Sequence, residues 1–307
     1  MLSGRGVMLS VSASVMFAVM PALVSQLAPL TGLDVFAWRI LLTLPGTLVI
    51  VSVLRRWNIL GSTISHVLHR PALLGAVLLC AALLSVQLWL FVWAPLQQRL
   101  LDVSLGYFLL PLTMVLAGRT VYKERLNRLQ LAAVIVAALG VAHELWATRA
   151  LSWVTALIMF GYPPYFVLRR RLRLDPLSGF TMEVLAMTPV AAVVLWQAWP
   201  QNAIVLGEPR YWLWLPALGL LSAGALASTL GAARMLPIGL YGIFGYVEPV
   251  LLFVVSIFLL DEPFTARGLW TYMPIWFGVV LVVFDSLRTL RRQRLASTAE
   301  RTGATDR

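Results

Sequence analysis

Long apolar segments constrain the fold of this 307-residue chain more than any other feature of its sequence. Ten of them follow one another, each of about the 20 residues that a helix needs to cross the hydrocarbon core of a bilayer. They cover residues 6–27, 33–54, 71–93, 100–121, 126–146, 152–168, 177–199, 211–233, 238–260 and 264–287. Because helices satisfy their backbone polar groups locally, they are suited to lipid. The sequence predicts an all-α integral membrane protein with ten transmembrane helices.

The composition agrees with a membrane protein and argues against a nucleic-acid partner. Hydrophobic residues make up 60% of the chain and charged residues 12%, whereas roughly 25% of a soluble domain is charged. The net charge of +11 comes from basic residues grouped at the ends of the apolar segments, where lipid headgroups and topology account for them. The lipid bilayer is therefore the expected partner.

The basic residues also predict an orientation. Of the 24 Lys and Arg residues, nineteen fall at one set of segment ends and four at the other, while Arg39 lies within a segment. Positive loops are retained in the cytoplasm. We expect both termini on the cytoplasmic side of the membrane.

The chain repeats its own pattern. Three pairs are separated by 138 residues, namely Pro111 and Pro249, Glu124 and Glu262, and Gly140 and Gly278. Phe36, Arg39 and Pro45 match Phe180, Glu183 and Pro189 at a separation of 144 residues. Such self-similarity indicates a duplicated unit, and an odd number of crossings in each copy inverts the second. We predict two inverted five-helix repeats, at 1–148 and 149–287, with a basic cytoplasmic tail at 288–307.

Two ionisable residues occupy equivalent places in the two predicted copies. Arg39 lies about 9 Å inside the second segment and Glu183 lies at the same depth from the opposite side. They would then be about 12 Å apart along the membrane normal, which suits the two ends of a zwitterionic solute. Snorkelling of Arg39 to the interface and a capping role for Glu183 remain open.

Glu248 lies near the middle of the ninth segment, directly before Pro249. A carboxylate there is either protonated or paired, and the proline can kink the helix. Proton coupling through Glu248 is therefore one hypothesis, and a locked structural pair is the other. Tyr107, Trp89, Trp93, Tyr162, Tyr165 and Tyr246 are candidate aromatic residues of the same cavity, or packing residues.

Other sources of energy and chemistry have little support in the sequence. It has no Gly-rich loop ending in Gly-Lys-Ser/Thr for a nucleotide, and His66, His69 and His143 have no metal-site spacing, so we expect no cofactor, no metal and no catalytic residues. Glu124 and Glu262 are interpreted as capping residues in turns that enter helices.

Several short runs carry a resemblance to a known family. They are Asp102-Val103-Ser104-Leu105-Gly106-Tyr107-Phe108 with Pro111, Glu124-Arg125, Trp38-Arg39, Gly179-Phe180-Thr181-Met182-Glu183 and Glu262-Pro263. They resemble the RarD branch of the EamA, or drug/metabolite transporter (DMT), family, across nearly all ten segments. The resemblance implies an inner-membrane permease, often named chloramphenicol-sensitive protein, whose relatives export amino acids and metabolites. Glu248 replaces a small residue of that pattern and Gln87 replaces an Asn, so both bear on the polarity of a cavity.

Together these features predict a gradient-driven secondary transporter that exports small metabolites, amino-acid-like solutes or drugs such as chloramphenicol. The expected substrate-binding residues are Arg39, Glu183, Glu248, Tyr107, Trp89 and Gln87. The alternative is a non-transporting membrane protein, either a lipid-modifying enzyme or a structural or regulatory partner. An enzyme needs a nucleophile and a base that converge, whereas the charges here are distributed over both copies.

Overall fold

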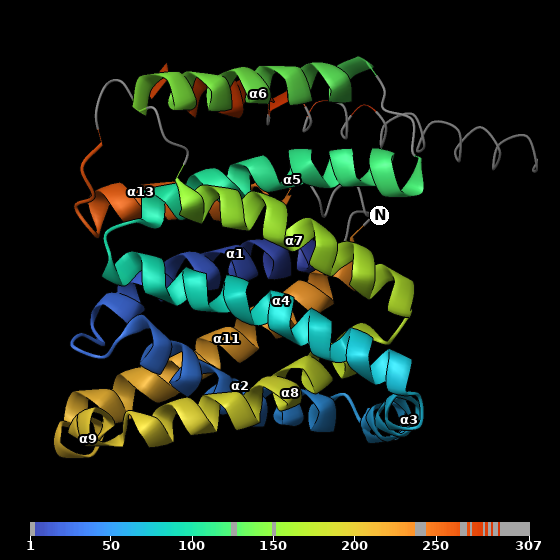
Figure 1. Cartoon of the computed structure of the whole chain (residues 1–307), viewed down its shortest axis with the longest axis vertical. Coiled ribbons are helices and arrows are strands. Elements are labelled where there is room, and N and C mark those ends of the chain that lie inside the picture. Colours follow the sequence, from blue (N-terminus) through green and yellow to red (C-terminus); the bar gives the residue numbers. More distant parts are fainter. Residues whose placement is uncertain are drawn as a thin grey trace, which may run out of the picture.

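Helices account for all the regular secondary structure in the described part of the chain (Figure 1). The structure is a computed structural model. It describes residues 4–123, 128–148, 152–236 and 244–264, and those between 269 and 288 except 271, 279, 282–283 and 285–287. The long helices run side by side in Figure 1, while α3 is seen nearly end-on.

The described helices have the following bounds. They are α1 (Gly4–Ser25), α2 (Gly32–Val53), α3 (Trp57–Leu68), α4 (Pro71–Leu96), α5 (Leu100–Tyr122), α6 (Arg128–Thr148), α7 (Trp153–Leu172), α8 (Pro176–Gln197), α9 (Trp199–Asn202), α10 (Ile204–Gly207), α11 (Pro209–Met235) and α13 (Val247–Phe258). Within the described ranges six of these, namely α1, α2, α4, α5, α8 and α11, are long and apolar enough to cross a membrane. The chain is therefore a multi-pass membrane protein.

The predicted segments match the described helices closely along most of the chain. The short helices α9 and α10 lie between the predicted seventh and eighth segments, where no helix was expected, and there are two larger differences. The stretch between the second and third segments, expected to be a loop, contains α3, whose Leu60 and Val67 are buried. The ninth segment was expected to be one helix over 238–260, but α13 begins at Val247, after a turn at Gly245 and Tyr246. The tail lies outside the described residues, apart from Arg288.

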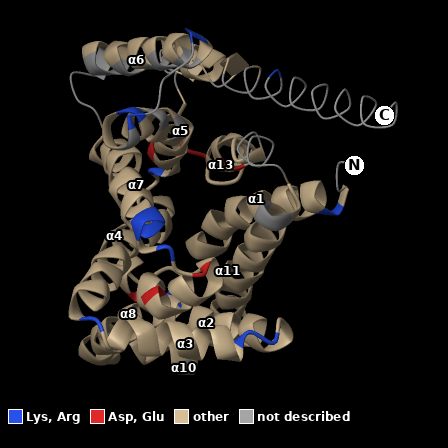
Figure 2. Cartoon of the chain, turned by 90° about the vertical axis from the view of Figure 1, so that its right-hand side faces the viewer, with Lys and Arg blue, Asp and Glu red and all other residues tan. Residues whose placement is uncertain are grey.

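Helices from the first part of the chain pack against helices from the second. The main contacts join α1 to α11 and α13, α2 to α8 and α11, α4 to α7 and α8, and α5 to α7 and α13. If α1 is exchanged with α7, α2 with α8, α4 with α11 and α5 with α13, six of these contacts become one another and the α2–α8 and α5–α13 contacts map onto themselves. Figure 2 shows these helices surrounding the centre of the molecule.

The starts of α2 and α8 are built alike. Thr31 caps α2, and its side-chain oxygen accepts from the backbone N–H of Asp34 at 3.2 Å, while Asp175 caps α8 and accepts from the backbone N–H and hydroxyl of Ser178. Such caps satisfy N–H groups that a helix leaves unbonded in its first turn. Two capped helices therefore begin at opposite ends of the packed pair.

Glu262 also acts as a cap, but of a different helix from the one expected. Its carboxylate accepts from the backbone N–H groups of Leu100 at 2.5 Å and Leu101 at 2.8 Å, at the start of α5. A negative charge is favourable at a helix N-terminus. Glu262 thus joins the end of α13 to α5, and Glu124 lies outside the described residues.

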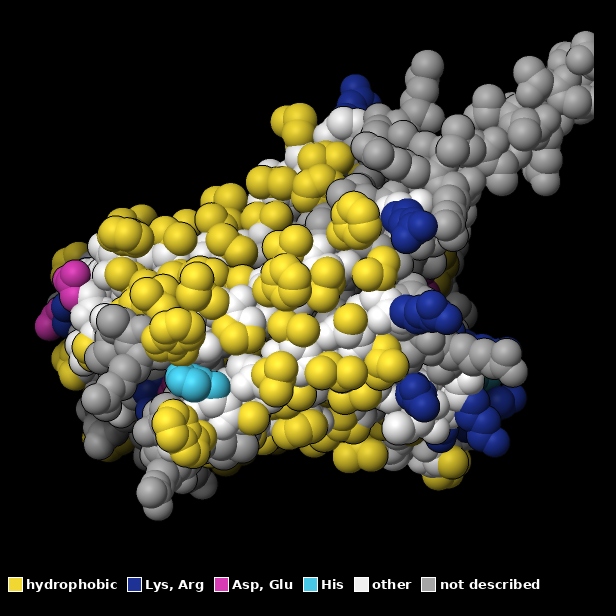
Figure 3. Space-filling model, turned by 90° about the horizontal axis from the view of Figure 1, so that it is seen from above, with side chains coloured by type: hydrophobic (Ala, Val, Ile, Leu, Met, Phe, Trp, Pro, Cys, Tyr) yellow, Lys and Arg dark blue, Asp and Glu magenta, His cyan; other side chains and the backbone are white. Residues whose placement is uncertain are grey.

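The outer surface combines a broad apolar area with charged ends. Figure 3 shows a face on which hydrophobic side chains cover the middle and Lys and Arg gather mainly toward one end. Exposed residues such as Trp196, Leu220 and Phe258 are more than 70% accessible in the isolated chain. In a membrane protein such side chains contact lipid, so the apolar area corresponds to the bilayer.

Candidate functional site

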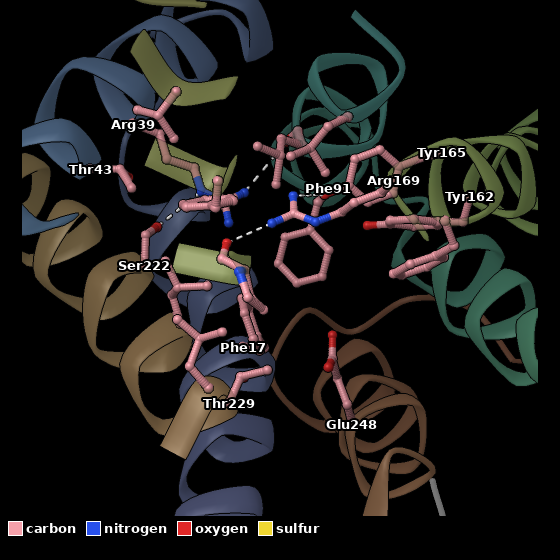
Figure 4. Close-up of a pocket in the computed structure, with 18 of the residues that line it drawn as sticks. Phe17, Arg39, Thr43, Phe91, Tyr162, Tyr165, Arg169, Ser222, Thr229 and Glu248 are labelled. Atoms are coloured by element: carbon pink, nitrogen blue, oxygen red, sulfur yellow. Dashed lines mark hydrogen bonds between the residues drawn. The ribbon is translucent and has the colours of Figure 1, made fainter. Parts of the chain in front are cut away.

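A cavity of about 370 Å³ lies at the centre of the helix bundle. Its walls come from α1, α2, α4, α5, α7, α8, α11 and α13, so both parts of the chain contribute. Most of its surface is apolar, and a few polar groups project into it from separate helices (Figure 4). A concave, largely apolar site with a few placed polar groups is typical of a small-molecule binding site.

Arg39 enters this cavity from α2. It lies on the buried face of that helix, which also carries Val35, Phe36 and Thr43, and only 4% of it is exposed. This burial excludes the snorkelling interpretation. Its Nε donates to the Ser222 hydroxyl at 3.0 Å. It makes no ion pair with any described carboxylate, and its guanidinium lies 5.6 Å from the centre of the Phe91 ring.

Glu248 enters from the opposite side, on α13. It is the second residue of that helix, and Figure 4 shows its carboxylate directed into the cavity. Pro249 lies in the first helical turn, where a missing N–H breaks no helix bond. The described helix therefore begins just before Glu248 and Pro249, after the turn at Gly245 and Tyr246, and does not run unbroken through this point. Within the described ranges Glu248 forms no hydrogen bond or ion pair.

An aromatic wall extends along the cavity. Ring contacts of 5.2 to 6.4 Å join its members in the order Phe17, Phe91, Tyr107, Tyr162, Phe166 and Tyr165. The hydroxyls of Tyr107 and Tyr162 share a hydrogen bond of 2.9 Å. Such a wall provides a large apolar contact area with two hydroxyl groups in its middle.

Glu183 is not among the residues that line the cavity, and its charge is paired. Its carboxylate accepts from Arg169 at 2.6 and 2.7 Å and from the Tyr165 hydroxyl at 3.1 Å. The residue is 3% exposed and lies between α7 and α8. This arrangement is an interhelical ion pair, neither the cap nor the free charge considered from the sequence. Arg169 itself reaches the cavity surface.

Gln87 and Trp89 lie elsewhere. The Gln87 side chain donates to the Leu157 carbonyl at 3.0 Å and so joins α4 to α7, and a Cβ on Gly161 would overlap it. Trp89 stacks on Trp153 at 6.5 Å and lines a separate cavity near the turn at 28–33. Of the six predicted site residues, Arg39, Glu248 and Tyr107 therefore meet in the central cavity.

Sequence reasoning missed Arg169, Phe91 and Ser222. A signal for Arg169 was present, because α7 buries Ile158, Tyr162 and Tyr165 on one face. Residue 169 continues that face at helical spacing. From the sequence it was instead grouped with the neighbouring arginines, as one of the basic residues that set the orientation in the membrane. Ser222 and Phe91 are common residue types inside apolar segments, and their sequence gives no such signal.

The cavity can hold a small solute that is charged at two places and apolar between them. A buried charge is costly unless it is paired, and Arg39 and Glu248 are unpaired with each other and with other described residues. A carboxylate near Arg39 and an ammonium near Glu248 would compensate both charges. Among the described residues no three His, Cys, Asp or Glu side chains converge as metal ligands.

Comparison with known proteins gives consistent similarities over nearly the whole chain. The sequence is 47% identical to the chloramphenicol-sensitive protein RarD of Pseudomonas aeruginosa, over 95% of this chain and 98% of that protein. It is 36% identical to an uncharacterized transporter of Pasteurella multocida, over 94% of this chain and 99% of that protein. It is 28% identical to the protein RarD of Salmonella typhimurium, over 94% of this chain and 98% of that protein. No family model matches the chain.

Proposed function

The chain belongs to the RarD family of membrane transporters, and from this premise we propose that it exports small amphipathic solutes through the central cavity. The observation that carries the proposal is the presence of two unpaired charges of opposite sign, Arg39 and Glu248, in one aromatic-walled cavity. The solute that compensates both is zwitterionic with an apolar or aromatic part, as in an amino acid with a large side chain.

The arrangement of the helices supports a transport mechanism with two inverted repeats. The main contacts between the two parts of the chain are preserved when α1, α2, α4 and α5 are exchanged with α7, α8, α11 and α13. Such pseudo-symmetry is common in secondary transporters, where the substrate site lies between the repeats. In this proposal the two repeats move against each other and open the cavity alternately to the two sides.

Export is proposed from the orientation and from the family. The excess of basic residues at one set of helix ends assigns that end to the cytoplasm of the inner membrane. The sequence lacks a nucleotide-binding loop, so the energy comes from an ion gradient. Glu248 is the proposed proton carrier, because it is the described carboxylate that lines the cavity without a hydrogen bond.

A second candidate substrate is chloramphenicol itself. One relative, at 47% identity, is named a chloramphenicol-sensitive protein. Chloramphenicol has an aromatic ring that suits the wall of Phe91, Tyr107 and Tyr162, but it carries no charge for Arg39. Comparison of the two solute classes therefore decides between recognition by charge and recognition by the aromatic wall.

The test is efflux from reconstituted vesicles loaded with aromatic amino acids, small polar amino acids or chloramphenicol. We expect the aromatic amino acids to move, and to move faster under a pH gradient. Glu248→Gln should make the flux independent of that gradient. The lipid-facing change Leu220→Ala serves as the matched control and should behave as wild type. Absence of flux for every solute, or flux through Glu248→Gln that follows the gradient as in wild type, would contradict the proposal.

A further inference from the structure

A second hollow, of about 350 Å³, lies beside the central cavity and has an entirely apolar lining. We call it the α2–α11 groove. It is lined by Val49, Ile50, Val53, Leu54, Leu177, Ala227, Leu230, Gly231 and Met235. Leu177 at its base is 1% exposed, whereas Val49 and Val53 at its rim are 60% and 75% exposed. The groove therefore opens on the surface that contacts lipid.

The α2–α11 groove and the central cavity share one residue, Leu230. On the cavity side its neighbours along α11 are Leu226 and Thr229, and on the groove side they are Ala227 and Gly231. On α2 the lining passes in the same way from Arg39, Ile40 and Thr43 to Val49, Ile50 and Val53. The two hollows thus follow one another along the α2–α11 seam and adjoin at Leu230, which lines both.

The packing of α2 against α11 explains why the seam opens at this end. Near the middle of both helices they touch closely, since a Cβ on Gly46 would lie 2.5 Å from the Cβ of Ala223. Beyond that contact the groove separates them. Leu230 itself packs against a small buried cluster formed by Val51, Leu60 and Leu177.

We propose that the α2–α11 groove binds the hydrocarbon part of an amphiphilic solute and admits it from the adjoining lipid leaflet to the central cavity past Leu230. The groove offers no hydrogen-bonding side chain, so its occupant is apolar. The rim of the groove faces the acyl chains of the surrounding lipid. The cavity beyond Leu230 offers Thr229, Arg39 and Glu248 for a polar head. This inference rests on the proposed function, and it adds bilayer-soluble amphiphiles to the solutes that reach the central cavity.

Labelling of a single cysteine tests this path without transport. Cys80, the one cysteine of the chain, is replaced by Ala, and Thr229→Cys provides a reporter in the cavity. The protein is placed in lipid nanodiscs and treated with dodecyl-maleimide, which partitions into the bilayer, or with a negatively charged maleimide, which stays in water. Val49→Cys in the groove reports access from lipid.

We expect dodecyl-maleimide to label Val49→Cys readily. Relative to the protein that keeps Leu230, it should label Thr229→Cys about tenfold faster in Leu230→Ala and about tenfold slower in Leu230→Trp. The charged reagent should react with Thr229→Cys at an unchanged rate in both. Leu220→Ala, at a lipid-facing position on the same helix, should change neither rate. Melting temperatures of the Leu230 variants show whether each is folded.

Three results would overturn the inference. Equal dodecyl-maleimide rates across the Leu230 variants would mean that the groove holds only surrounding lipid. Parallel changes with the charged reagent would mean that the variants loosen the protein or open an aqueous route. Labelling of Val49→Cys by the charged reagent alone would mean that the groove does not face lipid. Because none of these readouts depends on flux, they are distinguishable from a failure of the proposed transport activity.

Discussion

The charged residues in and beside the central cavity are of two kinds. Glu183 and Arg169 compensate each other at 2.6 Å between α7 and α8. Arg39 and Glu248 reach the central cavity and form no ion pair with a described residue. Loss of one partner from a buried pair leaves the other charge uncompensated, whereas loss of an unpaired buried charge removes a desolvation cost. Similar substitutions at the two kinds of site should therefore have different effects on stability.

We expect Glu183→Gln to lower the free energy of unfolding by about 2 kcal/mol, because Arg169 loses its charged partner. Arg39→Gln should change it by less than about 1 kcal/mol, since only a hydrogen bond to Ser222 and a weaker one to a backbone carbonyl are lost. Thermal unfolding of the purified protein in detergent measures both.

The double variant Arg169→Gln/Glu183→Gln is the control for this comparison. It should recover part of the stability that Glu183→Gln loses, because neither charge is then buried alone. An equal loss of stability in Arg39→Gln and Glu183→Gln would show that Arg39 is structurally paired after all.

The three predicted site residues that line the central cavity share a simple property. Arg39, Glu248 and Tyr107 are polar groups in apolar segments, so burial toward the interior of a bundle could be predicted from the cost of exposing them to lipid. The partner of Glu183 could not be predicted, because it depends on how α7 and α8 pack. Arg169 also lies in a basic run whose other members face away from the cavity.

At the scale of elements, helix α8 begins at a cap that is tied to the end of α2. The Arg56 guanidinium donates to Asp175 at 2.8 Å. Burial raises the pKa of Asp175, but the hydrogen bonds from Ser178 and the charge of Arg56 outweigh it, so that the pKa lies below its usual value. Asp175 therefore contributes stability above the pKa of an unfolded Asp, about 3.9, and this contribution is lost as the pH falls through the lower pKa of the folded state.

Asp175→Asn should remove this pH dependence. As the pH is lowered from about 5 toward 3, the wild type should lose about 1 kcal/mol or less of stability through this group, while the variant should start lower and lose correspondingly less. Melting temperatures across this range test the expectation, with Asp261→Asn as a control in another loop. Parallel curves for wild type and Asp175→Asn would contradict it.

The caps also explain which helix boundaries could be predicted. Helices α2 and α8 begin within one residue of the predicted positions, because the capping residues Thr31 and Asp175 directly precede them. Helix α3 was not predicted, since twelve residues between two basic runs lack the length of a membrane span. The start of α13 was missed because the sequence stays apolar through Gly245 and Tyr246, so hydropathy alone gives no boundary there.

For the whole molecule, the two parts of the chain are packed together around one cavity. Every long helix that borders it from the first part contacts a helix of the second. The central cavity therefore belongs to neither part alone. In the inverted-repeat proposal the two parts have opposite orientations in the membrane, and the distribution of Lys and Arg sets which end is cytoplasmic.

Reporter fusions test that orientation. A reporter after Arg128 or after Arg173 should be active in the cytoplasm, and one after Glu208 should be active in the periplasm. The reason is that the first two points lie among clustered basic residues and the third follows α8 at the opposite end. A cytoplasmic signal after Glu208 would contradict the inverted arrangement.

The central claim is that Arg39 and Glu248 recognise the two charged ends of one solute. It is tested most directly by the binding of three matched compounds, an aromatic amino acid, its methyl ester and its deaminated acid, to wild type, Arg39→Gln and Glu248→Gln. Arg39→Gln should weaken the binding of the amino acid and of the deaminated acid by about 2 kcal/mol, or roughly thirtyfold in Kd, and leave the binding of the ester unchanged. Glu248→Gln should weaken the binding of the amino acid and of the ester by a similar factor and leave the binding of the deaminated acid unchanged. Equal losses for all three compounds in either variant, or no loss in both, would contradict the claim.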